Sequence, residues 1–161
     1  MKEEFLNMID NNQGIIHKIT SIYGSDKEDR KDLFQDIVLQ LWKSYPSFEH
    51  RSSVSTWMYR VALNTALLRN RKKQTWLPLT DAISVQDSRQ PDVEKNDQLI
   101  SLYMAINQLG PLDKAIAFLF LEKNNYQEIA DVLGMNKNTI GVRLNRIRVK
   151  LKKVLEYERG K

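Results

Sequence analysis

The sequence contains no cysteine and only two histidines, His17 and His50, which lie far apart in the chain. Without thiols there are no disulfides, no thiolate zinc site and no cysteine nucleophile. We expect the two histidines to be ordinary helix and loop residues rather than metal ligands. No run of about 18 apolar residues is present, and the acidic start MKEEFLNMID is unlike a signal peptide. These absences predict a soluble, cytoplasmic protein without membrane insertion, metal or cofactor.

Proline and glycine are also scarce, with four and six among 161 residues, which argues against a low-complexity chain. A hydrophobic fraction of 42% supports a packed core, and this length allows one ordinary domain or two small ones. The net charge of +5 fits an acidic partner such as nucleic acid. The alternation typical of strands never extends beyond a few residues, so we predict an all-α fold.

Two helical patterns separated by a glycine occupy residues 126–153, YQEIADVLGMNKNTIGVRLNRIRVKLKK. The first ends at Gly134, and glycine terminates a helix in the left-handed conformation without a Cβ clash. The small Ala130 allows the two helices to cross closely. Asn136 or Asn138 can cap the second helix by accepting a bond from a free backbone N–H. This arrangement predicts a helix-turn-helix.

The second of these helices has no acidic residue over most of its length. Residues 137–153 contain seven Lys or Arg and no Asp or Glu, and such charge suits a helix that lies against phosphates. Its inward stripe has spacings of four, three and four residues and consists of Ile140, Leu144, Ile147 and Leu151. The pattern indicates binding to double-stranded DNA. A plain pair of helices with a solvated basic face is the alternative.

Helical patterns also fill residues 1–74, which we predict to form the first domain. The chain starts with one helix or with a pair broken around Gly14. The segment DKEDRKDLFQDIVLQLWKSY follows, capped by Ser25 or Asp26 and ended by Pro46. A further helix is expected from about residue 54 to residue 73. The apolar face of the middle helix is predicted to contain Leu33, Phe34, Ile37, Val38, Leu41 and Trp42.

Residues 75–95 differ from both flanks, because they contain two prolines and no clear period, and residues 75–94 have four acidic residues against one basic residue. Some 20 residues without secondary structure are unusual inside a compact domain, so we predict a flexible linker. Residues 96–161 then form the second domain. It is expected to start with a helix near residues 97–109, to break at Gly110-Pro111, and to continue through another helix into the helix-turn-helix.

A second stretch without acidic residues runs from His50 to Pro78, mostly within the first domain. Basic charge follows a phosphate backbone, while rings and polar loop atoms receive bases that have left the stack. The pattern therefore suits a strand being opened. Trp57 either packs in the core or borders this groove. Asn64 stands among Ala and Leu, where a buried unpaired amide would be costly.

The helix before this stretch has a polar face opposite its apolar stripe, made of Asp32, Gln35, Asp36 and Gln40. From the residues alone, this face is either solvated or a docking surface for another protein.

The chain resembles the extracytoplasmic-function (group IV) sigma factors of bacterial RNA polymerase, a group of the sigma-70 family. Three segments carry the resemblance in the family's order across nearly the whole chain. The polymerase-binding helix of the family is similar to DLFQDIVLQLWKSYPSF, its promoter-melting helix to STWMYRVALNTALLRNRKK, and its C-terminal helix-turn-helix to residues 126–153. Where the family often has Lys-Ser in the last helix, this chain has Gly141-Val142. A mid-helix glycine costs about 1 kcal/mol relative to alanine, and neither side chain offers a hydrogen-bond donor to a base edge.

The resemblance implies three sets of contact residues. Asp32, Gln35 and Asp36 are expected to contact the coiled coil of the largest polymerase subunit, and Gln40 lies on the same face. Recognition and melting of the −10 element fall to residues 47–53 and the helix beside them, with Phe48, Arg51, Ser52, Ser53, Trp57, Arg60, Asn64, Arg69 and Arg71. Reading of the −35 element falls to Lys137, Asn138, Thr139, Val142, Arg143, Arg146 and Arg148. The implied partners are core RNA polymerase, promoter DNA and an anti-sigma factor, without a small-molecule substrate.

Two other functions compete with this interpretation. A stand-alone helix-turn-helix regulator would bind duplex DNA as a dimer, yet no heptad seam long enough for a dimerisation helix is present. An enzyme acting on nucleic acid would need carboxylates, and these are missing from both basic stretches, where a metal-dependent nuclease would place them. We therefore expect a specificity subunit without catalytic activity.

Overall fold

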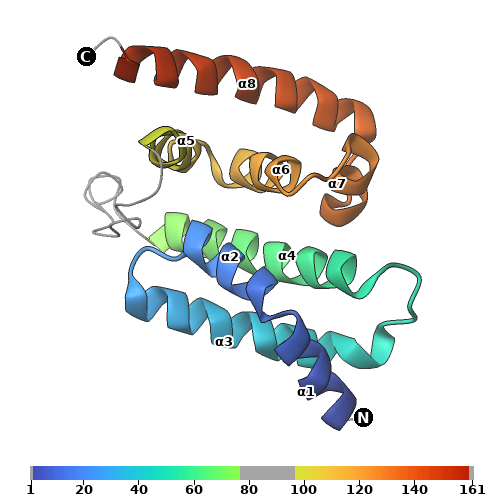
Figure 1. Ribbon diagram of the computed structural model, residues 1–161. Coiled ribbons are helices and arrows are strands. Elements are labelled where there is room, and N and C mark those ends of the chain that lie inside the picture. Colours follow the sequence, from blue (N-terminus) through green and yellow to red (C-terminus); the bar gives the residue numbers. More distant parts are fainter. Residues whose placement is uncertain (1, 77–96, 160–161) are drawn as a thin grey trace. The chain divides into compact units, whose positions relative to one another are not determined.

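The computed structural model describes residues 2–76 and 97–159 and contains only helices, turns and loops within these ranges. The chain divides into two compact units, of which the first carries α1 to α4 and the second α5 to α8 (Figure 1). The predicted all-α fold is confirmed. None of the described helices is both long and apolar enough to cross a membrane.

Within residues 2–76, the first unit has five elements. They are α1 (Lys2–Asn11), α2 (Gln13–Tyr23), α3 (Lys27–Ser44), the short 3-10 turn η1 (Tyr45–Ser47) and α4 (Val54–Trp76). Helices α2, α3 and α4 pack on one another. Their largest fully buried side chains are Ile16, Ile19, Leu33, Ile37, Leu41, Met58 and Leu63. The α3 stripe expected from the sequence therefore supplies the centre of the core.

The helix boundaries of this unit are set by local hydrogen bonds. The chain starts with a pair of helices, which was one of the two predicted alternatives. The break lies at Asn12 and not at Gly14. The Asn12 carbonyl accepts from the backbone N–H of Ile15 at 3.1 Å. Gly14 belongs to the first turn of α2. Asp26 caps α3 by accepting from the backbone N–H of Asp29 at 2.8 Å. Helix α4 continues to Trp76, beyond the predicted domain boundary, and the remaining predicted linker residues lie outside the described ranges.

The second unit consists of α5 (Asp97–Asn107), α6 (Pro111–Leu121), α7 (Tyr126–Leu133) and α8 (Lys137–Arg159). The expected break after α5 is present, and Pro111 occupies the first position of α6. Proline is tolerated there because the backbone N–H that it lacks would be unpaired in any case. Helix α8 packs against each of the other three. The core of this unit is formed by residues that include Ile116, Leu119, Ile129, Ala130, Ile140, Leu144 and Ile147.

The turn between α7 and α8 has the geometry predicted for a helix-turn-helix. Gly134 adopts φ 65° and ψ 35°, in the left-handed region, and its N–H bonds to the carbonyl of Ala130. Ala130 is 2% exposed, so a larger side chain has no room there. Of the two candidate caps for α8, Asn136 performs the role, since its Oδ1 accepts from the backbone N–H of Asn138 at 2.8 Å.

Candidate functional site

The predicted docking residues lie together on the exposed side of α3. Asp32, Gln35, Asp36 and Gln40 are all exposed, while Leu33, Ile37 and Leu41 on the opposite side are buried. Spacings of three and four residues place the polar side chains on one helix face. We call these four residues the docking face.

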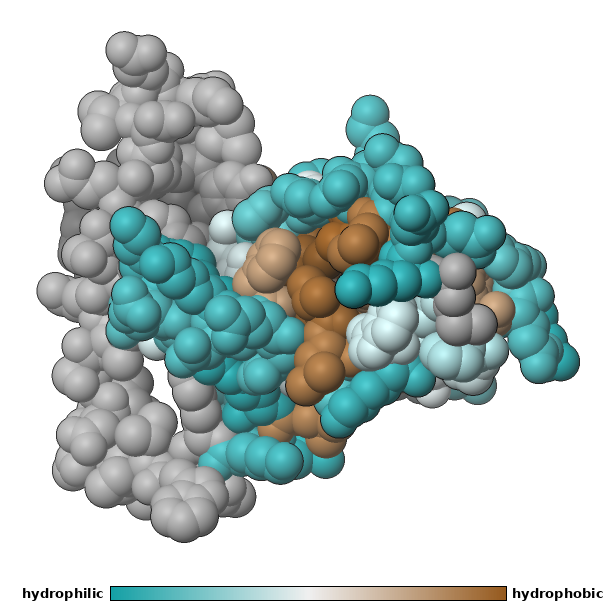
Figure 2. Space-filling model, turned by 90° about the horizontal axis from the view of Figure 1, so that it is seen from below, coloured by the Kyte–Doolittle hydropathy of each residue, from teal (hydrophilic) through white to brown (hydrophobic). Residues whose placement is uncertain are grey.

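Beside the docking face lies an apolar hollow of about 420 Å³ between α1 and α3. Figure 2, seen from the side of these helices, shows a hydrophobic band flanked by hydrophilic surface. The hollow is lined by Lys2, Phe5, Leu6, Phe34, Gln35, Val38, Leu39 and Trp42. Gln35 belongs to both surfaces, so the polar face and the hollow are continuous.

The sequence analysis missed this hollow. Trp42 was expected in the core, but 43% of it is exposed, because α1 covers only one flank of the stripe and meets the indole edge-on through Phe5 at 5.0 Å between ring centroids. Leu39 is 48% exposed. Its position three residues after Asp36 places it on the polar face, and that spacing was the signal available in the sequence.

Stacked rings support the loop between η1 and α4. The Phe48 ring lies 4.6 Å from the Trp57 ring at an interplanar angle of 13°, and the His50 ring lies 4.4 Å from Phe48. Trp57 is 7% exposed and therefore packs in the core. His50 has φ 57°, so the backbone turns in the left-handed region directly beyond the stacked phenylalanine. The loop is thus held by a ring anchored in the core.

The hydroxyl groups of this loop act mainly on its own backbone. Ser53 Oγ accepts from the backbone N–H of Thr56 at 3.1 Å and so caps α4. Ser52 Oγ donates to the Ser53 carbonyl at 3.4 Å. The guanidinium of Arg51 pairs with Glu49 at 2.7 Å, with both side chains largely exposed. Of these predicted site residues, Ser53 has a clear structural role.

Three predicted contact residues form an exposed stripe along α4. Arg60, Asn64 and Arg71 are all exposed, and their spacings of four and seven residues place them on one face. We call them the α4 stripe. The exposed position of Asn64 agrees with the expectation that its amide is not buried without a partner. Leu68, 56% exposed, continues the same face.

Arg69 lies apart from this stripe. Its side chain is only 20% exposed and its guanidinium faces α3, where Nη2 lies 2.6 Å from Asp29 and Nε lies 3.6 Å from Asp36. Five residues along a helix correspond to a rotation that separates Arg69 from Asn64. Sequence reasoning grouped Arg69 with the basic cluster because periodicity alone does not reveal which acidic side chain a neighbouring helix presents.

The N-terminal part of α8 exposes the predicted duplex-reading residues. Lys137, Asn138, Thr139, Val142 and Arg146 are all exposed. All but Arg146 lie in the first two turns of α8, and the N-terminal residues of the recognition helix contact base edges in helix-turn-helix proteins. Further along α8, a shallow hollow of about 380 Å³ is lined by Asn145, Arg146, Val149, Lys150 and Lys153.

The two other predicted arginines of α8 have partners within the second unit. Arg143 Nη1 donates to Asp113 of α6 at 3.0 Å, with both side chains about one third exposed. The guanidinium of Arg148 lies over the Phe120 ring, 4.9 Å from its centroid. Both contacts fasten α8 to α6 and leave part of each guanidinium at the surface.

Gly141 lies where α8 approaches the start of α7. A methyl group at this position would be 3.5 Å from Cε2 of Tyr126, an ordinary van der Waals distance. The glycine is therefore compatible with the helix but not required by it. The departure from the family's usual Lys-Ser pair falls at the interface between the two helices and at the exposed Val142.

Titratable groups with altered pKa values lie away from these surfaces. Burial raises the pKa of the Tyr23 hydroxyl, and burial lowers the pKa of the Lys114 ammonium. Among the residues that the structure describes, no group of three or more His, Asp or Glu side chains is placed to hold a metal ion.

Comparison with known protein families assigns both units. Residues 8–76 match the model of Sigma-70 region 2, and residues 99–151 match the model of Sigma-70 region 4. The docking face, the stacked rings and the α4 stripe lie in the first match, and the helix-turn-helix lies in the second. The presence of both regions in this order does not favour the alternative, a stand-alone helix-turn-helix regulator.

Curated relatives agree with the family models. The chain is 30% identical over 141 residues to the RNA polymerase sigma factor HrpL of Pseudomonas syringae pv. syringae, covering 80% of this chain and 74% of that protein. It is 29% identical over 146 residues to the ECF RNA polymerase sigma factor SigM of Mycobacterium tuberculosis, covering 88% of this chain and 72% of the relative.

Solved structures show the same fold. The sigma factor RpoE of Bartonella quintana, determined with the anti-sigma factor NepR, matches with a TM-score of 0.74 and 22% identity over 96% of both chains. CnrH, determined with the cytosolic domain of CnrY, matches with a TM-score of 0.68 and 17% identity over 98% of this chain and 90% of its own. Family models, relatives and fold agree, and the chain belongs to the extracytoplasmic-function group of the sigma-70 family of RNA polymerase sigma factors.

Proposed function

We propose that this sigma factor directs core RNA polymerase to promoters through three separate surfaces. The docking face of α3 meets the polymerase, the Phe48 loop and the α4 stripe meet the opened −10 strand, and the start of α8 meets the −35 duplex. The observation that carries the proposal is the distribution of charge. Carboxylates are exposed on the docking face, whereas the α4 stripe and the first turns of α8 expose arginine, lysine and amide groups.

The docking face combines two kinds of surface that suit a protein partner. Its carboxylates can pair with basic side chains of the polymerase, and the adjoining hollow can accept apolar ones. Interfaces typically join an apolar centre to a polar rim. An exposed tryptophan at such a border is typical of residues that carry much of the binding energy, so we assign Trp42 to this interface together with the four predicted residues.

The −10 surface would hold a strand after it opens. Removing one base from the stack costs a few kcal/mol, and this cost must be offset by contacts to the displaced base and its phosphates. The α4 stripe supplies arginines for the backbone, and the loop supplies polar atoms above a rigid stack of rings. Because Trp57 is buried, we infer that it supports the Phe48 loop rather than stacking directly on a base.

At the −35 element, Val142 gives the duplex-reading surface a testable chemical preference. An apolar side chain on the groove side of a recognition helix contacts the C5-methyl group of thymine. Replacing the contacted thymine by deoxyuridine removes one methyl group and should weaken binding about fourfold. In the Val142→Ala variant the same replacement should have little effect. An equal loss in both proteins would contradict the assignment of Val142.

We further infer that the chain supplies no catalytic group and acts in the cytoplasm, where the polymerase transcribes the chromosome. We propose an anti-sigma factor as a regulator, because RpoE, which has the same fold, was determined with the anti-sigma factor NepR. Addition of a candidate inhibitor to the reconstituted holoenzyme should abolish promoter-dependent transcripts. Unchanged transcripts at saturating inhibitor would exclude that candidate.

Run-off transcription tests the central proposal. Core polymerase is supplied with genomic fragments, with and without the purified chain, and the 5′ ends of the transcripts are sequenced. The chain should create a defined set of new start sites, and Asp36→Arg should remove them while the helical circular dichroism remains. Asp10→Arg, which reverses an exposed charge on α1, is the matched control and should transcribe normally. Failure of the unmodified chain to form a stable complex with core polymerase would refute the proposal.

A further inference from the structure

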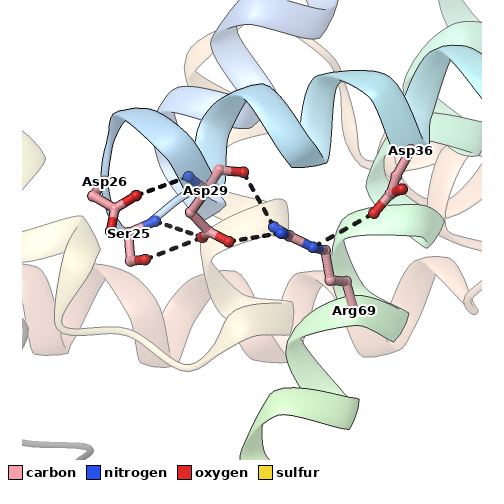
Figure 3. A network of polar contacts seen from close by, with 5 residues as sticks. All are labelled: Ser25, Asp26, Asp29, Asp36 and Arg69. Carbon is pink, nitrogen blue, oxygen red and sulfur yellow. Dashed lines mark hydrogen bonds and ion pairs between the residues drawn. The ribbon is translucent and has the colours of Figure 1, made fainter.

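A polar cluster joins the start of α3 to the C-terminal half of α4. Figure 3 shows Arg69 between two carboxylates of α3, Asp29 and Asp36. The side chains of Arg69 and Asp29 are 20% and 10% exposed, whereas that of Asp36 is 55% exposed. One guanidinium thus links a nearly buried carboxylate to one that belongs to the docking face.

The Asp29 end of the cluster is fixed by several bonds. Asp29 Oδ1 lies 2.6 Å from Arg69 Nη2, and Oδ2 accepts from the backbone N–H and the hydroxyl of Ser25 at 2.8 and 3.1 Å. Arg69 Nη1 also donates to the Asp29 carbonyl at 3.4 Å. Because the guanidinium is planar and its donors are held in a rigid fork, fixing one edge determines the direction of Nε.

The Asp36 end is looser. The distance of 3.6 Å between Nε and Asp36 Oδ2 allows an ion pair but exceeds that of a normal hydrogen bond. The carboxylate therefore keeps bonding capacity for another partner, and its half-exposed position makes that capacity accessible. The ion pair with Arg69 limits the conformations of the Asp36 side chain, while the carboxylate oxygens can still accept hydrogen bonds from another partner.

From this geometry we propose that Arg69 is a positioning residue of the polymerase-docking face and not a contact to promoter DNA. It orients the Asp36 carboxylate before docking and ties the docking helix to the strand-holding helix α4. The proposal rests on the function proposed above, in which Asp36 meets core polymerase. Ordering a side chain before association lowers the entropic cost of binding.

Affinity for purified core polymerase tests this role, with full-length labelled chain at a temperature where circular dichroism shows every variant folded. Arg69→Gln should weaken binding about 3- to 10-fold, the range expected when one side chain loses its pre-ordering. Lys72→Gln is the matched control. It removes an exposed positive charge from the same helix three residues away, and core affinity should not change.

A double-mutant cycle separates positioning from general stability. In the Asp36→Asn background, Arg69→Gln should cause little further loss, because the oriented group is already altered. Arg69→Lys covers the case in which Arg69→Gln fails to fold. Its compact ammonium can pair with Asp29 but lacks the fork that reaches Asp36, so it should fold and still weaken core binding.

Different failures have different meanings. If Asp36→Asn weakens core binding while Arg69→Gln does not, or if the two losses are additive, the positioning role is refuted and the docking face stands. If Arg69→Gln leaves core affinity intact but reduces the salt dependence of promoter binding by the holoenzyme, Arg69 contacts DNA after all. If Asp36→Asn itself has no effect on core affinity, the assignment of Asp36 to the docking face fails, and the role of Arg69 fails with it.

Discussion

The two glycines of the helix-turn-helix should respond in opposite directions to the same substitution. Gly141 lies within α8, where replacement by alanine gains about 1 kcal/mol of helix propensity. The added methyl group would lie 3.5 Å from the Tyr126 ring and would not have to displace it. Gly134 also has free space around its Cα, but its φ of 65° disfavours any Cβ. Alanine there should cost about 1–2 kcal/mol.

These energies are large enough to measure in a small unit. For a domain of 60–100 residues, 1 kcal/mol shifts the melting temperature by roughly 4–8 °C. Gly141→Ala should therefore raise the melting temperature of the second unit by about that amount, and Gly134→Ala should lower it by at least as much. Hydrogen exchange of the amides in α7 and α8 reports on this unit within the full-length chain.

The chain contains an internal control for this pair of variants. Its three tryptophans, Trp42, Trp57 and Trp76, all lie in the first unit, so tryptophan fluorescence follows that unit alone. The fluorescence transition should be the same in both variants. Affinity of Gly141→Ala for −35 duplex should also be unchanged, because the new methyl group faces Tyr126. A destabilising Gly141→Ala, or a neutral Gly134→Ala, would refute this account of the turn.

Three further predictions concern the first unit and are measured by urea unfolding followed through tryptophan fluorescence. Ile37→Ala should lower the free energy of unfolding by about 2–5 kcal/mol, because Ile37 is fully buried in the α3 stripe; a loss below 1 kcal/mol would contradict its place in the core. Asp26→Ala should cost about 1 kcal/mol by removing the cap of α3, whereas Asp26→Asn, which keeps an acceptor oxygen, should cost little. Burial raises the pKa of Tyr23, so the neutral hydroxyl is favoured in the folded state. The contribution of Tyr23 to stability should be constant below about pH 10, the pKa of an unfolded tyrosine, and should be lost as the pH rises above it. The resulting fall in stability should be smaller in Tyr23→Phe, and equal slopes would exclude Tyr23 as its source.

Much of the fold followed from the sequence because helices leave local signals. The spacings in α3 and α8 predicted their buried stripes, and Ile37, Leu144 and Ile147 are indeed buried. Gly134 predicted the left-handed turn, since few residues adopt positive φ without cost. The order of the three motifs predicted the family that the models of regions 2 and 4 identify.

Periodicity in the sequence predicted only in part which of the highlighted residues are exposed and which are buried. Periodicity placed the docking face on an exposed surface, but it assigned Trp42 to the apolar face of α3. This error has a physical cause. A helical pattern gives the direction of a side chain around its own axis, whereas exposure also depends on how much of that helix its neighbours cover.

The sequence by itself determined the helices, the turn between the last two and the surfaces that lack acidic residues, because these depend on residues close together in the chain. Only the tertiary structure decided that Arg69 faces Asp29 and Asp36, that Arg143 reaches Asp113, and that Trp57 supports the Phe48 loop from within the core. The residues in the two ion-paired clusters are separated by about 30 or more positions, and their contacts arise only when packed helices bring distant side chains together.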